Sequence, residues 1–186
     1  MKDIFRIVKD NATSIRAKSS EVSLDKIDEA VELANKMHDY LVMSQDNELS
    51  TKYHIREGVG LAAPQIGKNI DVICVYYIYE EDGQTKSVDH RLINPKIISE
   101  SIKLTYLQAG EGCLSVDKQH EGYVYRHHKI LVKAIDAADK QEKIITARGY
   151  EAIVLQHEID HLQGILYYDH IDKKDPFKVI EGSIRL

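Results

Sequence analysis

The amino-acid sequence predicts an α+β fold in which antiparallel β-sheets pack around a central α-helix, with an N-terminal helix on the outside. Three observations support this prediction. Apolar residues recur at helical spacing near the N-terminus, short β-branched segments separated by turn signals fill the middle of the chain, and a second helical pattern begins near residue 150. The chain has 186 residues and no internal repeat, so residues 1–186 are expected to form one domain.

The outer helix is predicted over residues 24–42. Its apolar stripe consists of Leu24, Ile27, Val31, Ala34, His38 and Leu41. Ser23 is a plausible N-cap, and Asp25 lies in the first turn, near the positive end of the helix dipole. Because His38 falls on the stripe, we expect a packed core histidine there and not a ligand. Residues 44–57 are polar and aperiodic, which predicts a long surface loop.

The middle of the chain predicts a series of strands. The first runs from Ile70 to Tyr79 and ends at the turn signal Glu81-Asp82-Gly83. Cys74 lies inside this strand, and its simplest interpretation is a small buried hydrophobic residue. Asp139-Lys140 predicts a hairpin turn. Further strands are expected near 91–98, 101–108, 122–126, 129–136, 142–148 and, at the end of the chain, 177–186.

The central helix is predicted from about Tyr150. Its apolar stripe consists of Ala152, Leu155, Ile159 and Leu162, and Gly164 is a natural C-cap. His157 and His161 lie nearly opposite this stripe at 100° per residue. We therefore expect other parts of the protein to cover this helix on both sides.

The pentapeptide HEIDH in this helix has the spacing of a metal site. Side chains four residues apart are offset by about 40° around a helix and by roughly 6 Å along it, so His157 and His161 can bind one metal ion. Glu158 lies at the edge of the same face, where it can act on a metal-bound water. The motif alone is also compatible with a solvated polar face. Ile153 and Val154 flank the histidines, which weakens that alternative and predicts a hydrophobic specificity pocket.

A catalytic metal needs a third protein ligand and one open position. The candidates downstream of the helix are in no convincing motif: Asp169, His170, Asp172, Asp175 and Glu181. Cys113, in the segment EGCLS, is the stronger candidate, because Gly112 permits a close backbone approach and a thiolate is a soft ligand. Without the HEIDH helix, Cys113 would be interpreted as a buried structural residue.

The segment GVGLAAPQ, residues 58–65, is the third informative stretch. Its glycines permit a tight backbone path, and Pro64 favours an extended conformation at Ala63. Such an edge can pair with an extended peptide through main-chain hydrogen bonds. Gln65 could donate an N–H to a developing oxyanion. By itself the segment would be a glycine-rich turn that carries a surface glutamine.

The composition narrows the function classes. Hydrophobic residues make up 43% and charged residues 30% of the chain, as in ordinary globular proteins. The net charge of −5 argues against direct nucleic-acid specificity. No apolar run is long enough to cross a bilayer, so no membrane association is expected. The two cysteines form no disulfide framework and the N-terminus lacks the features of a signal peptide, which predicts a cytoplasmic location.

Together, GVGLAAPQ, EGCLS and HEIDH resemble, in the same order, the three signature motifs of the peptide deformylases. The span from Gly58 to Gly164 covers 107 of the 186 residues. The polar stretch before Gly58 and the form EGCLSV resemble the longer of the two bacterial subclasses, type 2. The resemblance implies one peptide deformylase-like catalytic domain over residues 1–186.

The resemblance also implies roles for individual residues. One divalent metal per chain would be bound by Cys113, His157 and His161; it would be Fe²⁺ natively, with Zn²⁺, Ni²⁺ or Co²⁺ possible in purified protein. Glu158 would be the general base and acid. The remaining implied residues are Gln65 and the Leu114 backbone N–H at the oxyanion, Val59 and Gly60 as main-chain partners of the substrate, and Glu111 and Gly112 around Cys113. The predicted substrate-binding residues are therefore Val59, Gly60, Gly112, Ile153 and Val154. Ser115 matches the motif without an assigned role.

The implied reaction is the hydrolytic removal of the formyl group from N-formylmethionine at the N-terminus of newly made polypeptides, with release of formate. Nascent chains would be the partners, with a transient ribosome contact, and the protein is expected to be a monomer. His120 lies near a position where some members carry arginine, which affects only the outer peptide contacts. Two rivals remain at this point: another metallohydrolase, such as an endopeptidase or an amidase for other N-acyl groups, and a non-catalytic module with a structural metal.

Two smaller expectations concern the surroundings of the site. Arg126 and Asp160 could form an ion pair that fixes the Cys113 loop to the helix, or each could be separately solvated. His127, His128 and His170 are most simply surface histidines.

Overall fold

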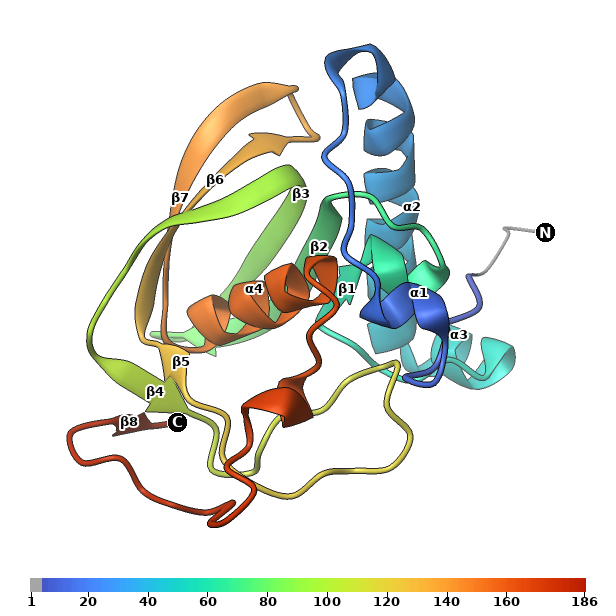
Figure 1. The fold of residues 1–186 in the computed structure, drawn as a ribbon. Coiled ribbons are helices and arrows are strands. Elements are labelled where there is room, and N and C mark those ends of the chain that lie inside the picture. The colour runs from blue at the N-terminus through green and yellow to red at the C-terminus, as the bar shows by residue number, and fades with distance from the viewer. Residues whose placement is uncertain (1–4) are drawn as a thin grey trace.

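Two β-sheets surround the helix that carries HEIDH (Figure 1). The structure is a computed structural model, and it describes residues 5–186. The larger sheet is antiparallel throughout, in the order β1-β2-β3-β6-β7. Its strands are β1 (Gly60–Ala62), β2 (Val72–Glu81), β3 (Gln84–Glu100), β6 (Lys129–Asp136) and β7 (Gln141–Arg148). The smaller sheet pairs β4 (Leu104–Tyr106) antiparallel with β5 (Arg126–His127) and parallel with β8 (Ile184–Arg185).

Strand β2 separates two hydrophobic cores. Val72 and Cys74 belong to the core beneath α2 (Ile27–Gln45), whereas Ile73 and Val75 belong to the core beneath α4 (Gly149–Leu162). Successive strand residues point to opposite faces, so a run of apolar residues is buried on both sides. Figure 1 shows α4 inside the curved sheet and α2 outside it. The predicted architecture is therefore confirmed, and Cys74 is the buried residue that was expected.

The outer helix begins later and ends later than predicted. A 3₁₀ turn, η1 (Leu24–Lys26), precedes α2, and Ser23 makes no side-chain capping bond to it. Leu24 is 83% exposed, so its assignment to the apolar stripe is wrong, because it lies before the α-helical turns that face the sheet. His38 is packed as expected, with its ring 5.0 Å from the ring of Tyr76 on β2.

The prediction of a long loop over residues 44–57 is wrong. Helix α2 continues to Gln45, and a short helix α3 (Asn47–Tyr53) follows. The Asp46 side chain accepts a hydrogen bond from the Leu49 N–H (2.8 Å), which caps α3. None of the residues of α3 is buried, so this helix has no apolar periodicity that a sequence pattern could reveal.

The strand predictions were accurate for β2, β6 and β7 of the large sheet and poor in the small sheet, and β3 begins at Gln84, seven residues before the strand predicted over 91–98. Strand β6 has the predicted bounds, β7 begins one residue earlier than expected, and Lys140 has the positive φ of a tight turn. Strands β4, β5 and β8 are much shorter than predicted. In the tail, the Tyr125 hydroxyl donates to the Lys178 carbonyl and accepts from the Ile180 N–H, in place of a strand partner.

Short helical turns complete the fold: α1 (Thr13–Arg16), η2 (Ala63–Ile66) and η3 (Tyr167–His170). Helix α4 ends where expected, with Gly164 at φ 73° just after its last residues. The Ile165 N–H bonds the Asp160 carbonyl and the Gly164 N–H bonds the His161 carbonyl, which is a Schellman motif. Within residues 5–186, every helix is too short or too polar for a membrane crossing.

Candidate metal centre

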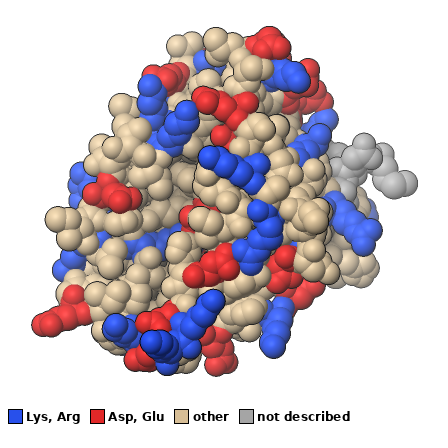
Figure 2. All heavy atoms as spheres, viewed as in Figure 1, with Lys and Arg blue, Asp and Glu red and all other residues tan. Residues whose placement is uncertain are grey.

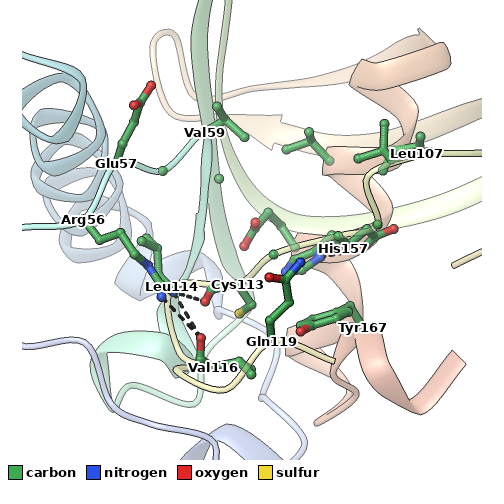
Figure 3. A pocket seen from close by; sticks show the side chains of 18 of the residues that line it. Arg56, Glu57, Val59, Leu107, Cys113, Leu114, Val116, Gln119, His157 and Tyr167 are labelled. Atoms are coloured by element: carbon green, nitrogen blue, oxygen red, sulfur yellow. Dashed lines mark hydrogen bonds and ion pairs between the residues drawn. The ribbon is translucent and has the colours of Figure 1, made fainter. Parts of the chain in front are cut away.

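Helix α4 and the loop between β4 and β5 bring three potential metal ligands together. Cys113, His157 and His161 are all buried, and each contributes one ligand atom to a group whose members lie within 4.8 Å of one another. The Cys113 Sγ is 3.3 Å from Nε2 of His161. Figure 3 shows Cys113 and His157 converging from the loop and the helix. The structure thus joins the three residues that the sequence singled out.

This donor set fits a catalytic metal ion. One thiolate and two imidazoles suit Fe²⁺, Zn²⁺, Ni²⁺ and Co²⁺ better than Mg²⁺ or Ca²⁺. Within residues 5–186, the group contains no fourth His, Cys, Asp or Glu ligand atom. Three protein ligands leave a position open for water or substrate, as catalytic sites require. The competing interpretation of HEIDH as a solvated polar face does not hold, because His157 and His161 are buried.

A carboxylate orients His157 from behind. The His157 Nδ1 is 2.8 Å from a carboxylate oxygen of Glu111, which leaves Nε2 free for the metal. The Arg126 guanidinium donates to both Glu111 oxygens (2.7 and 2.9 Å). Sequence reasoning placed Glu111 near the Cys113 loop but missed its bond to His157. The only signal was a carboxylate two residues before a candidate ligand.

The same guanidinium connects the loop to the helix. Arg126 Nη1 donates to Asp160 (2.6 Å), so the ion pair considered from the sequence exists and separate solvation is wrong. Asp160 also bonds Nε2 of His170 (2.7 Å). Of the three expected surface histidines, only His170 is exposed. His127 and His128 are both half-buried, because β5 pairs with β4 and packs against α4. Nδ1 of His127 lies 2.6 Å from the Ser101 carbonyl oxygen.

Burial and charge set the protonation of the two carboxylates. Burial alone would raise the pKa of Glu111, but Arg126 and His157 lower it to about 2. For Glu158, burial dominates and raises the pKa to about 7, although His157 and Arg126 oppose the shift. A carboxylate with a pKa near neutral pH can both accept and return a proton.

Glu158 is held against the edge strand of the sheet. A Cβ added at Gly60 would lie only 2.2 Å from Oε1 of Glu158, so a side chain at this position would displace the Glu158 carboxylate. Within the described part of the chain, Oε2 of Glu158 is buried without a hydrogen-bond partner. An unpartnered carboxylate oxygen beside a metal-binding group is available for proton transfer.

Gln65 is fixed beside Cys113 and is not a surface residue, since only 1% of it is exposed. Its Oε1 accepts from the Ala62 N–H (2.8 Å), which turns Nε2 toward Cys113 Sγ (3.5 Å) and Ser115 Oγ (3.4 Å). The fully buried Ser115, which had no role from the sequence, therefore helps to orient the amide.

Arg56 supports the loop that carries Cys113 and was missed by sequence reasoning. Its guanidinium donates to the carbonyl oxygens of Cys113 and Val116, as the dashed lines in Figure 3 show. Leu114 packs its side chain on the backbone of Gly58, where an added Cβ would lie 2.8 Å from Cδ1 of Leu114. Nothing in the pattern of the sequence connects Arg56 to a loop more than fifty residues away.

A cavity of about 590 Å³ opens beside the candidate metal centre, and Cys113 and His157 line it. Its wall includes all the predicted substrate-binding residues: Val59, Gly60, Gly112, Ile153 and Val154. Tyr150, Tyr167 and Leu107 also line it and were not predicted. His120 lies outside the wall, with its ring stacked on Tyr168 at 4.1 Å. Because β1 is the edge of the large sheet and pairs only with β2, its other edge is open to an extended peptide at this cavity.

Comparison with known sequences and structures places these features in one family. The polypeptide deformylase family model matches residues 4–177. The chain is 45% identical to a peptide deformylase of Staphylococcus epidermidis over 100% of this chain and 98% of that protein. It is 47% identical to one from Macrococcus caseolyticus, over 99% and 97% of the two chains.

Solved structures agree with this. A probable peptide deformylase from a Synechococcus phage is 37% identical and has a TM-score of 0.71, over 89% of this chain and 99% of that chain. A Met-Ala-Ser complex of a class I type b peptide deformylase from Acinetobacter baumannii is 26% identical with a TM-score of 0.73, over 92% and 100%. From its motifs, its fold and these matches, the chain belongs to the polypeptide deformylase family.

Proposed function

We propose that this enzyme removes the formyl group of N-formylmethionyl peptides at the centre formed by Cys113, His157 and His161. The observation that carries the proposal is the position of Glu158, a buried and unpartnered carboxylate beside three potential ligands. Cys113, His157 and His161 would hold a divalent metal ion, which would supply Lewis acidity for lowering the pKa of water and polarising the formyl carbonyl. From the family resemblance, we propose Fe²⁺ as the native ion.

Glu158 acts first as a base and then as an acid. It accepts a proton from water, and the resulting hydroxide attacks the formyl carbon. Negative charge develops on the formyl oxygen, and this oxygen accepts hydrogen bonds from Nε2 of Gln65 and the backbone N–H of Leu114. Removing one such donor typically costs about 3 kcal/mol, or on the order of a hundredfold in rate. As the C–N bond breaks, Glu158 returns the proton to the nitrogen, and the products are formate and a free N-terminus.

The cavity wall supplies the specificity. The methionine side chain enters the pocket to which Ile153 and Val154 contribute, and the main chain of Val59 and Gly60 pairs with the peptide. Gly112 keeps the opposite wall free of a side chain. The Met-Ala-Ser complex of the Acinetobacter baumannii relative supports a peptide ligand that begins with methionine. The hydrogen of the formyl group needs less space than the methyl group of an acetyl, which favours formyl substrates.

The proposal also covers the domain organisation, the subclass, the location and the partners of the enzyme. Residues 1–186 form a single catalytic domain of the longer bacterial subclass, type 2. The enzyme acts in the cytoplasm as a monomer on nascent chains, with a transient ribosome contact and no direct nucleic-acid specificity. The acidic net charge supports the last point.

The Glu158→Gln variant tests the catalytic role directly. We expect the variant to retain its metal and to lose at least about a hundredfold in kcat for formate release from formyl-Met-Ala-Ser, because amide nitrogen accepts no proton. Metal content and formate are measured on the same preparation, with Glu142→Gln on the exposed face of β7 as the matched control. Substantial turnover by Glu158→Gln contradicts the assigned role. Equal rates on formyl and acetyl peptides favour the rival amidase.

A further inference from the structure

The side chain of Arg56 holds carbonyl oxygens of the loop that carries Cys113. Its guanidinium donates to the carbonyl oxygens of Cys113 and Val116, and the Val116 N–H also bonds the Cys113 carbonyl (3.1 Å). Among residues 5–186, no carboxylate forms an ion pair with Arg56. The hydrogen bonds of this cation are therefore directed at the peptide groups of the loop.

The Cys113 carbonyl and the Leu114 N–H are the two ends of one peptide group. In a trans peptide these two bonds point in opposite directions, and the described residues contain no cis peptide. Figure 3 shows Arg56 on one side of the loop and His157, a member of the candidate metal centre, on the other. The bond from Arg56 to the carbonyl thus turns the Leu114 N–H away from Arg56 and toward the side of the candidate metal centre.

The Leu114 N–H has no partner of its own. Leu114 is only 7% exposed, yet within the described part of the chain its N–H donates no hydrogen bond. The great majority of buried backbone N–H groups in folded proteins are paired. Because Cys113 and Leu114 both line the cavity, this unpaired donor is available to a molecule bound there.

A hydrogen bond at one end of a peptide group strengthens the donor at the other end. Resonance couples the C=O to the N–H, and hydrogen bonds in a chain strengthen one another by about 10–30% per bond. A charged donor has the larger effect, because charge-assisted hydrogen bonds are roughly twice as strong as neutral ones. Arg56 therefore both orients the Leu114 N–H and makes it a stronger donor.

We propose that Arg56 is a positioning residue, which fixes and polarises the Leu114 N–H at the oxyanion through the Cys113–Leu114 peptide. The inference rests on the proposed deformylase function, in which the charge on the formyl oxygen develops only during the attack. A stronger donor then raises kcat and leaves KM little changed. If the N–H contributes on the order of a hundredfold in rate, the loss of about 10–30% of its strength lowers kcat about 2- to 4-fold.

Nuclear magnetic resonance can report on this peptide group alone. Val75 follows Cys74, so Cys113 is the only cysteine followed by leucine. Protein that carries ¹³C at the cysteine carbonyls and ¹⁵N in leucine gives one HNCO signal, from the Leu114 N–H. In the zinc-loaded enzyme, which is diamagnetic, we expect Arg56→Met to move the ¹⁵N resonance upfield. Arg56→Lys, which can still donate to the Cys113 carbonyl, should keep most of the wild-type shift.

Formate release from formyl-Met-Ala-Ser gives the kinetic test, with rates expressed per bound zinc ion. We expect Arg56→Met to lower kcat at least about 2- to 4-fold with KM changed less than about twofold, and Arg56→Lys to recover most of kcat. Arg185→Met, on β8 outside the cavity, removes the same charge and should match the wild type. An unmoved Leu114 signal in Arg56→Met, or an effect confined to KM, overturns the inference. The absence of formate with the wild-type enzyme would instead contradict the proposed function.

Discussion

At the scale of single residues, Glu158 and Gly60 depend on each other across the cavity. The carboxylate fills the space that a side chain at position 60 would occupy. We therefore expect Gly60→Ala to push Glu158 out of place and to lower kcat/KM by at least about a hundredfold, since displacing a catalytic group by 1 Å has an effect of this size. Formate release and thermal unfolding are measured together. A folded variant with near wild-type activity would show that Glu158 tolerates the shift.

Glu111 gives a prediction for stability at acidic pH. Its pKa falls from 4.5 to about 2 in the folded state, so the contribution of its ionised form is fully present above about pH 4.5 and is lost as the pH falls toward 2. A shift of this size corresponds to about 3 kcal/mol. In Glu111→Gln, the free energy of unfolding should vary less with pH over this range.

Urea unfolding at several pH values in the presence of a chelator measures this dependence without a contribution from metal release. Glu48→Gln serves as the control and should follow the wild-type pH profile. If Glu111→Gln follows the wild-type profile too, the Arg126–Glu111 ion pair is not what stabilises the protein at moderately acidic pH.

At the scale of elements, the end of α4 is joined to the N-terminal segment at Gly164. This glycine has φ 73°, and a Cβ there would lie 2.3 Å from the carbonyl oxygen of Arg16. The Ser19 N–H also bonds the Leu162 carbonyl (2.8 Å). The helix that carries two potential ligands is thus positioned by backbone contacts with residues about 150 positions earlier in the chain.

A side chain at a glycine with positive φ can cost stability through backbone strain and through a steric clash. The variants Gly164→Ala and Gly182→Ala separate these two costs. Both residues have φ near 75°, but a Cβ at Gly182 would meet nothing within 4 Å. We expect about 1 kcal/mol of destabilisation for Gly182→Ala, from backbone strain alone. Gly164→Ala should lose a further 1–3 kcal/mol because the Arg16 backbone must move. Equal losses in denaturant unfolding would argue against close packing at Gly164.

At the scale of the whole molecule, the candidate metal centre lies where separate parts of the chain meet. Cys113 belongs to a small core with Ile15, Val124 and Tyr167, whereas the inner face of α4 packs on the large sheet. A metal ion bound by Cys113, His157 and His161 would link the loop that carries Cys113 directly to α4.

On the face of the molecule shown in Figure 2, positively and negatively charged side chains are interspersed.

Removal of the metal should destabilise the fold. A ligand present at a hundred times its Kd contributes about 2.7 kcal/mol, so chelation should lower the Tm by about 5–10 °C for a chain of this length. Differential scanning calorimetry with and without chelator measures this shift. Cys113→Ser should abolish most of the shift, whereas Cys74→Ala, in the core beneath α2, should keep it on a less stable protein. An equal shift in both variants would contradict Cys113 as a ligand.

Local patterns in the sequence determined most of the long elements. Helices α2 and α4 were predicted because their apolar residues repeat at helical spacing, and strands β2, β6 and β7 because short segments rich in β-branched residues lie between turn signals. The four-residue spacing of His157 and His161 also predicted that both lie on one face of the helix. These predictions required only distances of a few residues, over which backbone geometry alone fixes the relative positions of side chains.

The motifs and the family resemblance had already suggested Cys113 as the third ligand, and the structure places its Sγ 3.3 Å from Nε2 of His161, 48 residues away. Only the tertiary structure revealed that Arg56 bonds the carbonyl of Cys113, 57 residues away. It also revealed α3, which buries nothing, and the short strands of the small sheet. Contacts of this kind depend on how the complete chain packs, so the spacing of residues along the sequence does not encode them. The sequence therefore identified the reactive groups, and the fold determined the side chains that hold, neutralise and surround them.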